Sequence, residues 1–360
     1  MTSSLSSNPT AVPPEFLSEI PAKESRMTEP TQQAAASIET AMFEMKKVIV
    51  GQDRAIERLF IGLLARGHVL LEGVPGLAKT LAVETLAKVV GGTYSRLQFT
   101  PDLLPADLIG TRIFRSSSET FDIEWGPVFA NIVLADEINR APAKVQSALL
   151  EVMAEHQVSI AGVTKQVPEP FLVLATQNPI ESEGVYPLPE AQRDRFLMKI
   201  VVGYPSANEE MEIVNRMGVN PPQAAQVLSL QQLEELQKAC DAVYVAPSVA
   251  DYAVRLVLAT REPNTYGLGD LSSLIAWGAS PRATLGLVAG GRALALMRNR
   301  NYVLPQDIFD VAPDILRHRV VPSYEALAQG ISVEQLMARI LSTVHAPVVS
   351  PSQNPTWSGQ

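Results

Sequence analysis

The sequence predicts an α/β fold, in which a parallel sheet is flanked by helices, followed by an all-helical domain. Three observations predict it. Apolar runs at 69–71, 132–135 and 171–175 each end in polar residues, as buried parallel strands often do. A glycine-rich turn at 73–80 joins the first run to a helical stretch. From about residue 204 onward, apolar residues recur only at helical spacing.

The glycine-rich turn reads Gly-Val-Pro-Gly-Leu-Ala-Lys-Thr and predicts a phosphate-binding loop for a nucleoside triphosphate. Such a turn leaves several N–H groups unpaired at the positive end of a helix dipole, where phosphate fits. Lys79 adds a positive charge, and the Thr80 hydroxyl is a ligand for Mg²⁺. Ala78 replaces the second glycine of the usual pattern, and we expect it to adopt the opening turn of the helix. The binding residues expected here are Gly73, Val74, Pro75, Gly76, Leu77, Ala78, Lys79, Thr80 and Leu81.

The second apolar run ends in two carboxylates, Asp136 and Glu137. Because ligands of open α/β sheets bind at the carboxyl ends of the strands, these acids are expected beside the phosphate loop. Asp136 would then hold Mg²⁺, and Glu137 would polarise the attacking water. A pair of solvated acids at the end of a strand is the alternative interpretation.

The third run ends at Asn178, which is placed to orient a water, and Pro179 ends that strand. A short helical segment follows and carries Arg193 and Arg195. Residues two apart do not share a helix face, so the two arginines are expected to have different roles.

In this order, the motifs resemble those of the AAA+ ATPases, and within that superfamily the chain resembles the MoxR family. The resemblance covers about residues 35 to 345. Besides the phosphate loop, it rests on Val50-Gly51-Gln52, Gly126-Pro-Val-Phe-Ala-Asn131, Leu134-Ala-Asp-Glu-Ile-Asn-Arg140, Ala175-Thr-Gln-Asn-Pro179, Glu190-Ala-Gln-Arg-Asp-Arg-Phe196 and Gly278-Ala-Ser-Pro-Arg-Ala283.

The resemblance implies an AAA+ P-loop NTPase module with a helical lid, and a ring, usually a hexamer, with ATP between neighbouring subunits. It assigns Asp136 to the metal, Glu137 to the water and Asn178 to the γ-phosphate. Arg195 becomes the arginine finger that acts on the neighbour's ATP. Arg282 matches sensor 2, in cis or in trans, with a capping or solvated charge as the alternative. Arg193 is either a helper or a surface or interface charge. The residues implied near the adenine are Val50, Gly51 and Gln52.

Composition agrees with this interpretation. The chain has 360 residues, and its net charge of −9 argues against general nucleic-acid binding. Cys240 is the single cysteine, so an internal disulfide is excluded. It is expected to lie on a helix and to be a small residue of the hydrophobic core. His68 and His156 are expected to be structural. No apolar run of 18 residues and no export signal is present, so a cytoplasmic protein without a membrane span is expected.

The predicted organisation has four parts. Residues 1–33 form a disordered tail, 34–203 the nucleotide-binding domain, 204–345 the helical lid and 346–360 a flexible tail. Asp53 is expected to cap a helix that runs through Arg66. Two hairpins are predicted, one with a polar tip at 115–120 and one with Gly162 at its turn. Lid helices are expected at 209–217, 230–244, 249–260, 281–298, 305–316 and 333–342.

The function predicted from these features is Mg-dependent ATP hydrolysis in a homo-hexameric ring. The family implies chaperone-like remodelling, maturation or metal insertion of a client protein, often with a von Willebrand factor A domain partner. The nearest alternatives are the ATPase subunit of a metal chelatase and a slowly hydrolysing, nucleotide-gated binding switch. A ring helicase and a small-molecule P-loop kinase are weaker alternatives.

Overall fold

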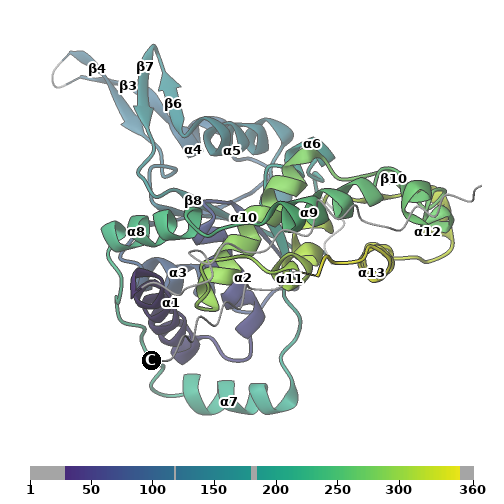
Figure 1. Ribbon diagram of the computed structural model, residues 1–360. Helices are drawn as coiled ribbons and strands as arrows, with labels where there is room; N and C mark the ends of the chain where they lie inside the picture. The colour runs from purple at the N-terminus through teal and green to yellow at the C-terminus, as the bar shows by residue number, and fades with distance from the viewer. Residues whose placement is uncertain (1–28, 117–118, 180–184, 349–360) are drawn as a thin grey trace, which may run out of the picture.

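The protein is built around a five-stranded parallel sheet in the order β2–β5–β8–β1–β9. The computed structural model describes residues 29–116, 119–179 and 185–348 (Figure 1). The strands of this sheet are β1 Val69–Glu72, β2 Tyr94–Gln98, β5 Ile132–Asp136, β8 Leu172–Gln177 and β9 Met198–Val201. The three apolar runs predicted to be parallel strands are thus confirmed, and β2 and β9 are two additional strands at the edges of the sheet.

Alternate residues of each strand pack on opposite faces of the sheet. In β1, Val69 and Leu71 join one hydrophobic cluster, whereas Leu70 joins the other. The helices of this part of the chain are α1 Glu29–Val48, α2 Asp53–Leu64, α3 Lys79–Val89, α4 Pro105–Ile109, α5 Ala143–Glu155, α6 Glu190–Arg193 and the 3₁₀ turn η2 Ile138–Arg140. Helices α1, α2 and α3 cover the first face and α5 the second. This covering of both faces explains why the central strands β1, β5 and β8 are largely apolar.

Both predicted hairpins are confirmed, and they project from the same end of the molecule (Figure 1). The first pairs β3 Gly110–Arg115 with β4 Thr120–Trp125, and the second pairs β6 Gln157–Ile160 with β7 Val163–Gln166. Gly162 has a φ of +84° at the second turn, a conformation that glycine adopts without a steric penalty. Residues 117 and 118, in the tip of the first hairpin, lie outside the described residues.

The C-terminal part is mainly helical, as predicted. Its helices are α7 Ala207–Met217, α8 Leu230–Asp241, α9 Pro247–Ala259, α10 Pro281–Met297, α11 Pro305–Leu316, α12 Tyr324–Ala328 and α13 Val333–Thr343, with 3₁₀ turns η3 Pro263–Tyr266 and η4 Gly269–Leu271. The prediction of helices only was wrong, because β10 Ile275–Trp277 pairs with β11 Val321–Pro322 in an antiparallel ladder. These strands are too short for an alternating pattern to show.

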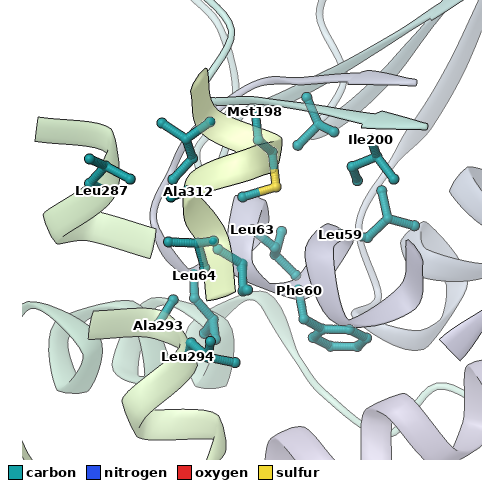
Figure 2. Close-up of a cluster of buried hydrophobic side chains, with 14 of the residues drawn as sticks. Leu59, Phe60, Leu63, Leu64, Met198, Ile200, Leu287, Ala293, Leu294 and Ala312 are labelled. Atoms are coloured by element: carbon teal, nitrogen blue, oxygen red, sulfur yellow. The ribbon is translucent and has the colours of Figure 1, made fainter. Parts of the chain in front are cut away.

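One hydrophobic core joins the two parts of the chain (Figure 2). Phe60 and Leu64 of α2 and Met198 of β9 lie in the same buried cluster as Leu294 of α10 and Ala312 of α11. The predicted boundary at 203/204 therefore does not separate two cores, and the start of the lid is packed on the sheet through shared apolar side chains.

Three predictions at helix ends were wrong. Helix α1 begins at Glu29, so residues 29–33 are helical and do not belong to a disordered tail. Asp53 is the first residue of α2 and does not cap it, since the N-cap is Gln52; the Asp53 carboxylate pairs with Lys46 Nζ at 3.1 Å. Helix α2 ends at Leu64, and Arg66 has a φ of +52°. The predicted tail segments 1–28 and 349–360 lie outside the described residues.

Cys240 is buried in α8, as expected. In the described part of the chain, none of the helices has the length and apolar character that crossing a bilayer requires.

Candidate functional site

The phosphate loop lies at the carboxyl edge of the sheet, between β1 and α3. It is pinned to the neighbouring strand, because the Gly73 N–H donates to the Gln177 carbonyl at 3.3 Å. A Cβ at position 73 would lie 2.7 Å from the Val202 carbonyl oxygen, so only glycine fits there. At Gly76, φ is +84° and the space around the α-carbon is open. The loop is therefore tightly packed at Gly73, whereas at Gly76 it is open and adopts a backbone conformation that favours glycine.

Ala78 does not open the helix as we expected. It has φ +54° and ψ +21°, the left-handed conformation, and it is the N-cap of α3. The chain reverses sharply here between the loop and the helix, which explains why glycine is usual at this position. For an L-residue this conformation costs about 1–2 kcal/mol.

The side chain of Lys79 folds back over the loop. Its Nζ donates to the carbonyl oxygens of Gly73 and Val74, the latter at 3.3 Å. Burial lowers the pKa of Lys79, while the nearby charges of Asp136, Glu137 and Glu72 act in the opposite direction. The ammonium group thus lies among the loop carbonyls, close to several carboxylates.

Two oxygens that suit a magnesium ion converge beside the loop. The Thr80 hydroxyl donates to Asp136 Oδ2 at 3.4 Å, and Asp136 is buried at the end of β5. Mg²⁺ prefers oxygen ligands and takes only one or two from protein carboxylates, so this donor pair fits it. The other carboxylate oxygen, Oδ1, accepts a hydrogen bond of 2.6 Å from the Thr176 hydroxyl.

Glu137 follows with φ +56° and ψ +50°. Its N–H donates to Thr176 Oγ1 at 2.8 Å, so a single threonine contacts both acidic residues. Its carboxylate accepts from Gln98 Nε2 at 3.0 Å and pairs with Arg140 at 3.3 Å. Asn178 is buried directly after β8, at the same edge of the sheet. The predicted residues of this edge are therefore brought together.

Three side chains that sequence reasoning missed complete this edge: Arg96, Gln98 and Thr176. Arg96 of β2 approaches Asp136 Oδ2 with Nη2 at 2.7 Å and Nε at 3.1 Å. Strand β2 pairs with β5 so that Gln98 lies opposite Asp136. The sequence feature that could have indicated Arg96 and Gln98 is the alternation of polar residues within 94–98. Only the pairing of β2 with β5 shows what these side chains contact.

An apolar pocket adjoins the loop. Its lining comes from the loop, α2, α3 and the ends of β1 and β9, and includes Ile49, Gln52, Ala55, Ile56, Leu77, Ala78, Lys79 and Val202. Gln52 also donates to the Gly203 carbonyl at 3.2 Å. Of the residues expected near the adenine, Gln52 lines this pocket and Gly51 lines the adjacent one, whereas Val50 does not line either. An apolar lining beside a phosphate loop is the kind of surface that contacts the face of an aromatic base.

The three predicted arginines do not lie at this edge. They lie toward the amino end of the sheet, because Leu197 donates to the His68 carbonyl and β9 then runs parallel to β1. The exposed Arg195 donates from Nη1 to the Leu150 carbonyl at 2.9 Å. Arg193 pairs with Glu190 at 3.2 Å, and the half-exposed Arg282 lies 3.6 Å from Asp194. Within one chain, these three arginines therefore lie away from the phosphate loop.

Comparisons with known proteins identify the family of this chain. A model of the ATPase family associated with various cellular activities matches residues 68–198, and a model of the AAA lid domain matches residues 271–340. Chaperone MoxR1 of Mycobacterium tuberculosis is 63% identical over 87% of this chain and 83% of its own length. Protein MoxR of Methylorubrum extorquens is 34% identical over 84% and 93%, respectively.

A solved structure of a protein from Cytophaga hutchinsonii has a TM-score of 0.84 and 49% identity, covering 89% of this chain and 98% of that one. Similarity of this extent, across both the sheet and the lid, establishes the family. The chain belongs to the MoxR family of AAA+ ATPases.

Proposed function

We propose that this protein hydrolyses Mg-ATP in a homo-oligomeric ring, in which arginines of one copy complete the nucleotide site of the next. The observation that carries this proposal is the separation within one chain: the phosphate loop, Asp136 and Glu137 lie at the carboxyl edge of the sheet, and Arg195 and Arg282 lie toward the amino edge. A strand of four residues is about 13 Å long. Because Arg282 lies beside Asp194, we propose that it acts in trans, together with Arg195.

Each residue at the carboxyl edge has a proposed role. The N–H groups of the loop and Lys79 bind the phosphates, while Thr80 and Asp136 hold the magnesium ion. When bound, the ion supplies charge neutralisation at the β- and γ-phosphates. Glu137 orients and polarises the attacking water, and Asn178 contacts the γ-phosphate. The apolar pocket at Gln52 takes the adenine.

The arginines supply positive charge from the neighbouring copy. Arg195 is exposed, and within the part of the chain that the structure describes its side-chain hydrogen bond is the one from Nη1 to the Leu150 carbonyl, so it is the finger in this proposal. Elsewhere, such an arginine is worth about 10³–10⁵ in rate. Arg193 pairs with Glu190 of its own helix and serves as a helper.

Hydrolysis is proposed to drive chaperone-like remodelling, maturation or metal insertion of a client protein. The name of Chaperone MoxR1 supports this class of work. Following the family, we take the ring to be a hexamer and a von Willebrand factor A domain protein to be a partner. The two hairpins are the candidate client contacts, since Phe114 and Phe121 are exposed on the first one.

The test is ATP turnover per subunit across a range of protein concentrations, with and without a fixed fraction of Arg195→Ala chains after subunit exchange. Specific activity should rise with concentration, because a site is completed only when copies assemble. A loss greater than the added fraction of variant would further show that the sites of one ring act in concert. Activity that is independent of concentration and merely diluted by Arg195→Ala would show that each chain hydrolyses alone. Tight ATP binding with turnover near zero would favour the binding switch instead.

A further inference from the structure

A carboxylate lies between the two arginines of the finger segment and contacts the lid. Asp194 is the C-cap of α6, directly after Arg193 and directly before Arg195. Its side chain is mostly buried, with 17% exposed, and it uses both carboxylate oxygens. Each oxygen has its own partners from the C-terminal part of the chain.

The first oxygen, Oδ1, accepts a hydrogen bond of 2.7 Å from Arg319 Nε. The Arg319 side chain is only 3% exposed, and its remaining nitrogens donate to backbone carbonyls, including that of Phe196 at 2.6 Å and that of Leu197 at 2.9 Å. Burial lowers the pKa of Arg319, and Asp194 opposes that shift. A guanidinium taken out of water requires such an anionic partner, so this pair fixes the backbone that leads into β9.

The second oxygen, Oδ2, accepts a hydrogen bond of 2.7 Å from the Ser280 hydroxyl and lies 3.6 Å from Arg282 Nη1. Ser280 is also the N-cap of α10, because its Oγ accepts from the Arg282 N–H at 3.2 Å. A carboxylate at this place faces the positive end of the α10 dipole. Asp194 therefore holds the start of the helix that carries Arg282.

We propose that Asp194 is a positioning residue that fixes Arg195 and Arg282 as one unit, so that a copy presents both arginines to its neighbour's ATP together. This inference rests on the proposed function, in which both arginines act in trans. Asp194 itself contacts no nucleotide. Asp194 acts only in the copy that donates the arginines. The phosphate loop of that same copy does not depend on Asp194.

Because Asp194 acts only in the donating copy, it can be tested in a mixture of two variants that are each inactive alone. Arg195→Ala chains retain a complete phosphate loop, and Lys79→Ala chains retain their arginines, so mixing should restore hydrolysis at the Arg195→Ala loops. Only the Arg195→Ala chains bind nucleotide in this mixture. The affinity for a non-hydrolysable ATP analogue is therefore a second readout, and it should increase when the donor chain is added.

Asp194→Asn is then introduced into one of the two chains at a time, either the donor of the arginines or the acceptor. On the donor, as Lys79→Ala/Asp194→Asn, it should reduce the restored turnover about tenfold to a hundredfold, since misplacing a catalytic group by about 1 Å has effects of this size. It should also abolish the gain in analogue affinity. On the acceptor, as Arg195→Ala/Asp194→Asn, both readouts should stay within about twofold of the parent mixture.

A merely structural role would damage both sides equally, and that result would overturn the inference. Asp251→Asn on the donor is the matched control, because Asp251 forms an exposed pair with Arg255 in α9. Ser280→Ala, which removes one donor to Oδ2 and leaves the Arg319 pair, should give a smaller defect confined to the donor side. If the parent mixture restores nothing, the proposed function fails, and this inference fails with it. If the parent mixture works and Asp194→Asn donors work equally well, only the inference fails.

Discussion

The guanidinium of Arg96 lies 2.7 Å from Asp136 Oδ2, the same oxygen that accepts a hydrogen bond from Thr80. A positive side chain from the edge strand β2 therefore contacts the carboxylate that is proposed to hold the magnesium ion. Two cations that share one carboxylate oxygen repel each other. Arg96 and Mg²⁺ are expected to compete for Asp136.

Replacing Arg96 by methionine should strengthen magnesium binding. Because Arg96 is half exposed, the repulsion is discounted for solvent screening to about 1 kcal/mol, which is roughly fivefold in affinity. The measurement is a Mg²⁺ titration of ATP-analogue binding in Arg96→Met. Arg115→Met is the control, since Arg115 pairs with Asp122 on the hairpin and should change nothing. A higher Mg²⁺ requirement in Arg96→Met would show that Arg96 helps to orient Asp136 for the metal.

Glu137→Gln should abolish ATP turnover and preserve nucleotide binding. The amide keeps the size of the side chain but is a far weaker base for the attacking water. The measurements are steady-state phosphate release and the affinity for a fluorescent ATP analogue. Glu84→Gln, at an exposed position of α3, should behave as wild type in both. Hydrolysis at the normal rate in Glu137→Gln would remove Glu137 from its proposed role.

Ala78→Gly should stabilise the protein, although most changes to glycine destabilise. The left-handed conformation costs alanine about 1–2 kcal/mol. The larger chain entropy of glycine offsets about 0.5–1 kcal/mol of this. The free energy of unfolding, measured with urea, is expected to increase by about 0.5–1 kcal/mol. The same substitution at Ala36, an exposed position in the middle of α1, should lower the free energy of unfolding by about 1 kcal/mol. Losses of equal size at both positions would contradict the strained conformation of Ala78.

Two buried histidines should make stability fall in mild acid. The His68 ring donates to the Met153 carbonyl and accepts from the Val173 N–H, and burial lowers its pKa to about 4. Burial, together with the charge of Arg319, lowers the pKa of His318 well below its ordinary value. His68 is therefore mostly neutral in the folded protein near pH 5, whereas it takes up a proton in the unfolded chain below about pH 6.5. The lowered pKa of His318 acts in the same direction.

The unfolded state binds more protons in this window, so stability is complete above about pH 6.5 and declines as the pH falls toward 4. His68 alone should account for about 2 kcal/mol between pH 7 and pH 5. Urea unfolding at the two pH values measures this loss. It should be smaller by about that amount in His68→Gln and unchanged in His345→Gln, where the side chain is exposed. Equal pH dependence in all three proteins would contradict the assignment.

The fold and the carboxyl-edge residues were predictable because their signals are local. The phosphate loop is one continuous segment, and Asp136, Glu137 and Asn178 directly follow apolar runs. The rule that parallel strands present their carboxyl ends at one edge then brings these residues together. The hairpins were likewise visible from the turn and from flanking alternation.

The missed residues depend on partners far away in the chain. Arg96 and Asp136 are 40 residues apart, and only the pairing of β2 with β5 brings them together. Asp194 was visible inside a recognised motif, but its partner Arg319 lies 125 residues further on. The conformation of Ala78 was mispredicted for a different reason: the residue type favours a helix, and the sharp reversal between loop and α3 overrides that preference.

The opposed placement of loop and arginines gives any assembly of this chain a direction. In the proposed contact, each copy completes a neighbour's site on one side and has its own site completed on the other, so the interface is heterologous. An open row of copies would have one uncompleted phosphate loop at one end and one unused pair of arginines at the other. Closure of the row removes both ends at once, so that every site becomes equivalent only when the last copy joins.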